Sequence, residues 1–274
     1  MSVDYDNRLH TIFSSAARMS SEGMAAWIAA FGARLPTRRP LKIADVGSGT
    51  GRFTPALAEA FGGPVYGVEP AARMRAVAER DAAHLHVAYR PGRCESIPLG
   101  DDAVDAAILF GVWHHVDDKA EAAHELFRIV SGGGSLLVRT TSRDRFPELW
   151  WYDHFPRARE IDVAMAAPLA STVSTLGEAG WEHIAVDEVS PVGSPITCAE
   201  DFARLRSRVM STFEHLSDEE IELGFANLTA VVARDPDRLA PRLPTDLLVF
   251  TKGTADLRTA SNPGRLATTS QQGG

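Results

Sequence analysis

A glycine-rich segment at the end of an apolar run is the part of this sequence best suited to binding a small molecule. Residues 45–52 read DVGSGTGR, and a helical pattern begins directly after them. Glycines at alternate positions let the backbone turn sharply off a strand and approach a ligand that a Cβ atom would exclude. The N-terminus of the helix that follows offers unpaired N–H groups to acceptors on that ligand. The segment therefore predicts a ligand-binding turn between a strand and a helix.

The spacing of these glycines separates two kinds of ligand. A dinucleotide-binding turn has the spacing G-x-G-x-x-G, and here the third glycine would fall at position 52, which is Arg52. The segment instead has the spacing G-x-G-x-G, with Asp45 two residues before the first glycine. This arrangement favours a nucleoside that carries a zwitterionic amino-acid arm over a pyrophosphate. A nicotinamide oxidoreductase and a turn without any ligand stay as alternatives.

An acid closes the next apolar run of the chain. Glu69 follows Val65–Val68, which we expect to be the second strand. A carboxylate at that place can accept hydrogen bonds from both hydroxyls of a ribose. Since many strands end in an acid, Glu69 gains its weight from the glycine-rich turn before it, and the two together predict an adenosyl ligand.

Two histidines follow a later apolar run, Val104–Phe110, and are candidates for proton transfer. They are His114 and His115. Imidazole titrates near neutral pH, and a general base assists reactions of phenols, alcohols and activated carbon acids. We predict His114 as the catalytic base, with a purely structural His-His pair as the alternative. His84 and His86 have strand spacing and suggest a metal site, but no third ligand is near them in the sequence, so no metal is expected.

Three further features could touch an acceptor molecule. The aromatic stretch Trp150–Phe155 is either a lid over an apolar acceptor or a buried anchor. Arg204 and Arg208 lie four residues apart and either bind an acidic substrate or form a solvated helix face. Tyr5 and His10 are candidate pocket residues near the N-terminus.

The elements that position these residues alternate between apolar runs and helical patterns from residue 41 to about 140. Strand and helix in alternation predict an α/β fold with parallel strands and right-handed crossovers. The nearly continuous apolar character of some runs predicts a sheet that is covered on both faces. The predicted strands are Leu41–Val46, Val65–Val68, Leu85–Tyr89, Val104–Phe110, Ser135–Arg139, His183–Val189 and Leu247–Thr251.

The rest of the chain divides around this alternation. Residues 1–40 are expected to be a helical segment, 41–252 the main domain, and 253–274 a disordered tail rich in small and polar residues. Inserts at about 142–175 and 191–244 are expected to form a helical cap. Within the second insert, Thr197 with Glu200 and Ser217 with Glu220 are capping boxes, and the apolar spacing after Thr197 predicts one helix that reaches Leu216.

Composition excludes several classes of protein. Lys and Arg number 28 against 36 Asp and Glu, a net charge of −8, which argues against binding to nucleic acid or to an anionic membrane surface. No apolar stretch is long enough to span a membrane, and the N-terminus does not resemble a signal peptide. The two cysteines, Cys94 and Cys198, indicate no disulfide framework. We therefore expect a cytoplasmic protein with a small-molecule acceptor, with a homodimer as an open possibility.

Together these motifs resemble the class I (Rossmann-like) S-adenosylmethionine-dependent methyltransferases of the small-molecule type. The resemblance is close over residues 41–140 and looser over 176–189 and 246–252. It implies a seven-stranded, mostly parallel, doubly wound sheet whose last strand is antiparallel and lies between the fifth and sixth. The segments that carry it, besides the turn and Glu69, are CESIPL at 94–99, DAVD at 102–105, FGVWHHVD at 110–117, ELFRIV at 125–130, GGG at 132–134 and LGEAGW at 176–181.

The resemblance also implies roles for individual residues toward the methionine arm of S-adenosyl-L-methionine. The backbone of Gly47, Ser48 and Gly49 would pass close to that arm. Asp45 would hold its ammonium group through water. The wall on the methionine side would come from Phe110 and Gly111.

On the nucleoside side, Glu69 would take the ribose hydroxyls, and Pro70 and Met74 would pack on the adenine. The backbone N–H of Cys94 would donate to the adenine. The family often has Asp immediately before this position, where this chain has Arg93, which cannot accept a hydrogen bond. The adenine amino group would then be contacted by Glu95 or by water.

The activity that the resemblance implies is transfer of a methyl group to an O, N or C atom of a small molecule, with S-adenosyl-L-homocysteine as the second product. The acceptor is expected to be a secondary metabolite. A non-methylating reaction of the cyclase or pericyclase type on the same fold and cofactor stays as an alternative, because a fold and its cofactor site do not determine the reaction.

Overall fold

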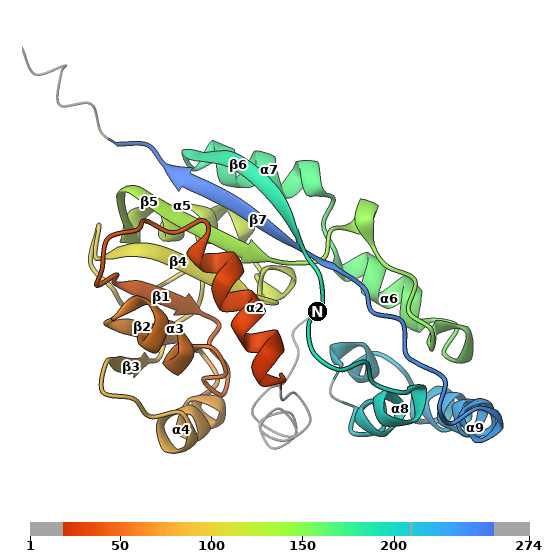
Figure 1. Ribbon diagram of the computed structural model, residues 1–274. Helices are drawn as coiled ribbons and strands as arrows, with labels where there is room; N and C mark the ends of the chain where they lie inside the picture. The colour runs from red at the N-terminus through yellow and green to blue at the C-terminus, as the bar shows by residue number, and fades with distance from the viewer. Residues whose placement is uncertain (1–18, 209, 255–274) are drawn as a thin grey trace, which may run out of the picture.

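A twisted seven-stranded sheet runs through the centre of the molecule in the computed structural model, which describes residues 19–208 and 210–254 (Figure 1). The strand order is β3-β2-β1-β4-β5-β7-β6. The strands are β1 (Ile43–Val46), β2 (Val65–Val68), β3 (Val87–Arg90), β4 (Val104–Phe110), β5 (Val130–Arg139), β6 (Trp181–Val189) and β7 (Thr245–Lys252).

The pairing of the strands confirms the predicted topology. The pairs among β1 to β5 are parallel, whereas β7 is antiparallel to both of its neighbours, β5 and β6. In register, Val46 lies beside Val68 of β2 and Leu109 of β4. The segments that follow these three residues therefore meet at one edge of the sheet, the carboxyl edge.

Helices cover both faces of the sheet, as Figure 1 shows. Helices α2 (Ser21–Gly32) and α3 (Thr54–Phe61) pack on one face, and α5 (Lys119–Ile129) and α7 (Leu169–Glu178) pack on the other, while α4 (Ala72–Asp81) follows β2. The inner strands are mostly buried, which agrees with their nearly continuous apolar sequences, whereas the edge strands β3 and β6 are more exposed. β3 begins two residues later than predicted, because Leu85 is 87% exposed and lies outside the sheet.

A separate group of helices lies beside the carboxyl ends of the parallel strands (Figure 1). It contains α6 (Ala158–Met165), α8 (Cys198–Arg206) and α9 (Asp218–Arg234), together with the 3₁₀ turns η4 (Tyr152–His154) and η5 (Ser211–Glu214), and we call it the cap. Its own apolar cluster includes Trp151, Phe155 and Phe202. The aromatic stretch is thus a buried anchor of the cap. Both predicted capping boxes are present, at Thr197 and Ser217.

One predicted helix of the cap is shorter than expected. α8 ends at Arg206 instead of continuing to Leu216, and Arg208 has a left-handed φ of 53°. The chain then turns into η5, which still brings Phe213 into the apolar cluster of the cap. Apolar spacing alone did not separate one long helix from a helix, a turn and a 3₁₀ segment, because both arrangements bury the same side chains.

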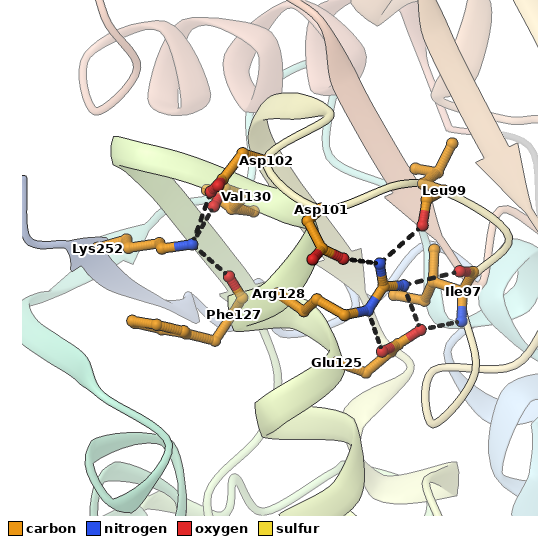
Figure 2. Close-up of polar contacts among 9 residues, drawn as sticks. All are labelled: Ile97, Leu99, Asp101, Asp102, Glu125, Phe127, Arg128, Val130 and Lys252. Carbon is orange, nitrogen blue, oxygen red and sulfur yellow. Dashed lines mark hydrogen bonds and ion pairs between the residues drawn. The ribbon is translucent and has the colours of Figure 1, made fainter. Parts of the chain in front are cut away.

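Hydrogen bonds from Arg128 and Lys252 join several segments at the amino edge of the sheet (Figure 2). The guanidinium of Arg128 donates to the carbonyl oxygens of Ile97 (3.2 Å) and Leu99 (2.9 Å), to Asp101 (2.7 Å) and to both carboxylate oxygens of Glu125 (2.7 Å each). Close by, the Lys252 ammonium at the end of β7 donates to Asp102 and to the carbonyls of Phe127 and Val130. These contacts tie the segment before β4 to the end of α5 and to the last strand.

The N-terminal and C-terminal predictions are covered only in part. Of the predicted helical segment 1–40, the structure describes residues 19–40, which include α2. Tyr5, His10 and most of the predicted tail lie outside the described residues. Within the described ranges, no helix combines the length and the apolar character needed to cross a membrane.

Replacing Arg128 by methionine should destabilise the protein by about 2 kcal/mol, because the carbonyls of Ile97 and Leu99 lose charged hydrogen-bond donors. Urea unfolding of wild type and variant measures the difference. The matched control is Arg159→Met, whose exposed guanidinium pairs only with the exposed Glu148 and should contribute less than about 1 kcal/mol. Equal effects of the two substitutions would remove the special role given to Arg128.

Candidate functional site

The glycine-rich turn after β1 has the backbone conformation that the sequence predicted. Gly47 and Gly49 have φ values of 73° and 57°, in the region that side chains with a Cβ rarely adopt. A Cβ on Gly47 would also lie 2.3 Å from a methyl carbon of Val112, so this glycine is required by the close passage of the segment after β4. A Cβ on Gly49 would meet nothing within 4 Å. The turn is therefore open on the side of Gly49.

Backbone hydrogen bonds hold this turn against the end of β2. The N–H groups of Gly47 and Ser48 both donate to the carbonyl oxygen of Val68, at 2.8 and 3.1 Å. The N–H of Gly49 donates to Oε2 of Glu69 at 3.0 Å. The Ser48 hydroxyl is buried without a hydrogen-bond partner in the described structure. The turn and Glu69, predicted separately from the sequence, thus form one unit.

Glu69 is a buried carboxylate with a defined orientation. Its side chain accepts from Gly49 N through Oε2 and from Ala71 N through Oε1, at 3.0 and 2.9 Å, and the residue is 8% exposed. Each carboxylate oxygen can accept more than one hydrogen bond, so these contacts leave Glu69 able to bind hydroxyl groups. The two N–H donors orient the carboxylate at the carboxyl edge.

Asp45 lies deeper than Glu69. It is 2% exposed, and its Oδ2 accepts from the hydroxyl of Thr54, at the start of α3, at 2.7 Å. The pKa of Asp45 is raised to about 6, mainly by burial and also by the negative charge of Glu69, while the Thr54 hydroxyl and the positive charge of Arg52 oppose the rise. A cation placed beside Asp45 would favour its ionised form. Thr54 is a partner that sequence analysis did not single out.

The residues predicted for the adenine have different surroundings. Met74 and Cys94 are buried, Pro70 is exposed, and burial raises the pKa of the Cys94 thiol. Oε1 of Glu95 accepts from the backbone N–H groups of Asp117 and Asp118, at 3.1 and 3.4 Å.

Arg93 lies among the same acids. Its guanidinium contacts Asp117 at 2.8 Å and Glu95 at 3.5 Å. Glu95 therefore already holds the turn before α5, which disfavours it as the acceptor for an adenine amino group. A water molecule is the alternative that the sequence analysis left for this contact.

His114 and His115 lie in the 3₁₀ turn η2 (Trp113–His115) directly after β4, with ring centroids 3.9 Å apart. Burial lowers the pKa of His114 to about 3, assisted by the positive forms of His115, Arg139 and Lys119. Burial also lowers the pKa of His115 to about 4, with His215 as the next cause. Both imidazoles are therefore neutral at pH 7. A base whose conjugate acid is this strong gives little driving force for removing a proton.

The cap contributes a third histidine that sequence analysis missed. His215 follows η5, and its Nε2 is buried without a hydrogen-bond partner in the described part of the chain. Its electrostatic effect on His115 places the two imidazoles near each other, one from the cap and one from the end of β4. Because His115 and His215 are about 100 residues apart in the chain, no local sequence pattern indicated that they lie near each other.

Two arginines at the same edge were also missed. Arg139 ends β5, and its guanidinium lies over the ring of Phe110, 5.2 Å from the ring centroid. The Phe110 ring packs in turn on Phe53 at 4.2 Å and on Trp27 at 4.8 Å. Arg52 immediately precedes Phe53. The predicted methionine-side wall at Phe110 is thus bordered by the cation of Arg139, and the positive charge of Arg52 is near enough to lower the pKa of Arg139.

The remaining candidates have other surroundings. Arg204 pairs with Asp201, and Arg208 pairs with Asp218, so the structure gives both arginines carboxylate partners within the cap. The rings of His84 and His86 are 5.8 Å apart. No group of three or more His, Cys, Asp or Glu that could hold a metal ion occurs among residues 19–208 and 210–254.

Comparison with known proteins identifies the sheet and its turn. Residues 44–138 match the family model described as a methyltransferase domain. An uncharacterised methyltransferase of Mycobacterium tuberculosis is 37% identical over 103 residues, which are 38% of this chain and 41% of that relative. The match thus spans less than half the length of that curated relative. A demethylmenaquinone methyltransferase of Anoxybacillus flavithermus is 28% identical over 69% of this chain and 86% of its own length.

Solved structures extend the similarity to the whole fold. A putative methyltransferase from an antibiotic biosynthesis pathway of Anabaena variabilis aligns with a TM-score of 0.67 and 23% identity, over 83% of this chain and 97% of its own. The [4+2]-cyclase SpnF aligns with a TM-score of 0.60 and 17% identity, over 92% and 95% of the two chains. At these identities the similarity establishes the fold.

The low pKa of His114 predicts a specific sensitivity to acid. Below pH 6.5 the unfolded chain protonates this imidazole while the folded chain does not, so stability is fully present above pH 6.5 and is lost as pH falls toward 3. Between pH 7.5 and 5, His114→Asn should lose about 2 kcal/mol less stability than wild type. Urea unfolding at both pH values measures this.

The matched control for that measurement is His124→Asn, which replaces an exposed histidine of α5 and should follow the wild-type pH profile. If His114→Asn and wild type lost the same stability between the two pH values, the burial effect assigned to His114 would be refuted.

Proposed function

The chain belongs to the class I S-adenosylmethionine-dependent methyltransferases, and on that premise we propose that it transfers a methyl group to an O, N or C atom of a small molecule. The observation that carries the proposal is the single hydrogen-bonded unit formed by the glycine-rich turn and Glu69 at the carboxyl edge. Ligands of open α/β sheets bind in the crevice at that edge.

The residues present fit the parts of S-adenosyl-L-methionine. Glu69 is oriented by two N–H donors, and its carboxylate oxygens are the kind of acceptor that ribose hydroxyls require. Asp45, buried and close to its protonation point, suits a neighbouring ammonium group. The open side of Gly49 and the unpartnered hydroxyl of Ser48 provide space and one hydrogen-bonding group between them. When bound, the cofactor supplies a methyl group that its sulfonium has already activated for displacement.

The chain's own contribution to the reaction is alignment of the acceptor. In-line displacement on an activated carbon gains most of its rate from the positioning of the reacting atoms in a water-excluded pocket. With a pKa of about 3, His114 acts as a neutral imidazole. It holds the acceptor by accepting a hydrogen bond from the nucleophile, in place of the full proton removal that the sequence suggested. His215 of the cap is near enough to His115 for its charge to lower the pKa of that imidazole.

Related proteins support an acceptor from small-molecule metabolism. Relatives named as demethylmenaquinone methyltransferases and a malonyl-[acyl-carrier protein] O-methyltransferase share the matched segment. The structural relative from Anabaena variabilis is assigned to antibiotic biosynthesis. We therefore propose a secondary metabolite as the acceptor and a cytoplasmic reaction.

A second candidate function is a non-methylating cyclisation, which the structural similarity to the [4+2]-cyclase SpnF favours. Mass spectrometry of reactions with a panel of phenols, quinols and carboxylic acids separates the two. A methyltransferase forms S-adenosyl-L-homocysteine and a product that is heavier by one CH₂ in equal amounts. A cyclase forms an isomer of its substrate and leaves the cofactor unchanged.

Glu69→Gln should weaken binding of S-adenosyl-L-homocysteine about 10- to 100-fold, because an amide has only one accepting oxygen where the carboxylate has two. Isothermal titration calorimetry measures the affinity. Glu79→Gln, on the exposed face of α4, is the matched control and should bind like wild type. Unchanged affinity in Glu69→Gln would remove this residue from the cofactor site.

A further inference from the structure

Arg139 is a half-buried cation without an anionic partner among the described residues. Its Nε is buried without a hydrogen bond, and within the described ranges its guanidinium makes no ion pair and contacts the ring of Phe110. Burial, assisted by the positive charge of Arg52, lowers the pKa of Arg139 to about 10. An arginine remains charged at pH 7 even so, and an uncompensated buried charge is strongly destabilising. The unpaired charge of Arg139 therefore needs a physical reason.

Two other arginines of this chain have hydrogen-bond partners that give their guanidinium groups a structural role. Arg128 donates to four residues of α5 and the segment before β4, as Figure 2 shows, and Arg145 donates to both carboxylate oxygens of Asp246. Both hold neighbouring segments together. Arg139 does not join segments in this way, because its guanidinium donates no hydrogen bond to another segment among the described residues.

Arg52 is a second cation without a hydrogen bond or ion pair among the described residues. It is partly buried, and burial lowers its pKa while the charge of Asp45 opposes the change. The carboxylate of Asp45 is engaged with Thr54. Arg52 is joined to Phe53, whose ring packs on Phe110 at 4.2 Å, and Arg139 lies over that same Phe110 ring. Arg139 thus borders the space beside Phe110, and the positive charge of Arg52 is near enough to lower the pKa of Arg139.

This space lies next to the cofactor site. The N–H of Gly111 donates to the carbonyl oxygen of Arg139 at 2.9 Å, and Nη1 of Arg139 lies 3.4 Å from the position of a Cβ on Gly111. Arg52 ends the glycine-rich turn. Both arginines are partly exposed residues, so a ligand in the crevice can reach them. Two neighbouring cations that have no counter-ion among the described residues would be stabilised by an anionic group of the ligand.

We propose that Arg139 and Arg52 together bind a carboxylate at the carboxyl edge of β5. The inference rests on the proposed function for the location of the cofactor and adds the chemistry of its neighbouring subsite. A planar guanidinium matches a carboxylate through two parallel hydrogen bonds. The carboxylate belongs either to the methionine arm of the cofactor or to the acceptor, and the chemistry of recognition is the same for both.

Calorimetry with a matched pair of ligands tests the first source. One ligand is S-adenosyl-L-homocysteine, and the other is its decarboxylated analogue, which keeps the ammonium group. If the cofactor supplies the carboxylate, wild type binds the first ligand at least tenfold more tightly, and Arg139→Met abolishes the preference without weakening the analogue. Arg159→Met, which replaces an exposed and paired arginine, should keep the preference.

Benzoate, titrated into protein saturated with S-adenosyl-L-homocysteine and separately into free protein, tests the second source. If the acceptor supplies the carboxylate, benzoate binds to wild type in both titrations, and Arg139→Met loses at least tenfold in affinity. Either positive result supports the proposal. It is overturned if Arg139→Met leaves both the ligand preference and benzoate binding unchanged, or if it weakens both nucleosides equally while benzoate binding stays unchanged.

Two additions keep the test decisive. Should Arg139→Met fail to fold, Arg139→Lys and the ¹⁵N resonance of the wild-type Arg139 side chain replace it, and a resonance that no carboxylate shifts would overturn the proposal. Wild type that binds neither nucleoside but binds benzoate through Arg139 would refute the proposed function while the carboxylate site stands. The two failures are thus distinguishable.

Discussion

The structure depends on the hydrogen bond between the Gly49 N–H and the Glu69 carboxylate, together with the two backbone bonds to Val68 beside it. These contacts join the ends of β1 and β2, so the turn can keep left-handed φ values without a ligand to support it. They also fix the carboxylate before any cofactor arrives. A preorganised acceptor does not have to be ordered on binding, and this lowers the entropic cost of recognition.

Buried charge is the second theme of the site. Asp45 is buried, and Arg52 and Arg139 are half-buried near the same edge of the sheet. Burial shifts the pKa of each group in the direction that favours its neutral form. A zwitterionic ligand would compensate both signs at once. Burial has the same effect on His114 and His115, and it changes the expected role of His114 from a proton acceptor to a neutral hydrogen-bonding group.

Local sequence predicted those features that depend on neighbours in the chain. The seven strands, the turn after β1 and the capping boxes follow from short patterns, whereas the strand order was implied by the family resemblance, and the structure confirms all of them. Contacts between distant segments had no such signal. His215 of the cap lies near His115 at the end of β4. In the sequence Arg139 is only the last residue of a strand, and its lack of a hydrogen-bond partner for Nε within the described residues is visible only in the structure. The end of α8 at Arg206 was missed because a helix and a turn bury the same apolar side chains.

A crystal structure of the protein with S-adenosyl-L-homocysteine tests the central claim most directly. The account predicts that the ribose hydroxyls lie within hydrogen-bonding distance of the Glu69 carboxylate and that the amino-acid arm passes the open side of Gly49. Density for the nucleoside at any other place, with Glu69 bonded only to Gly49 and Ala71, would contradict it.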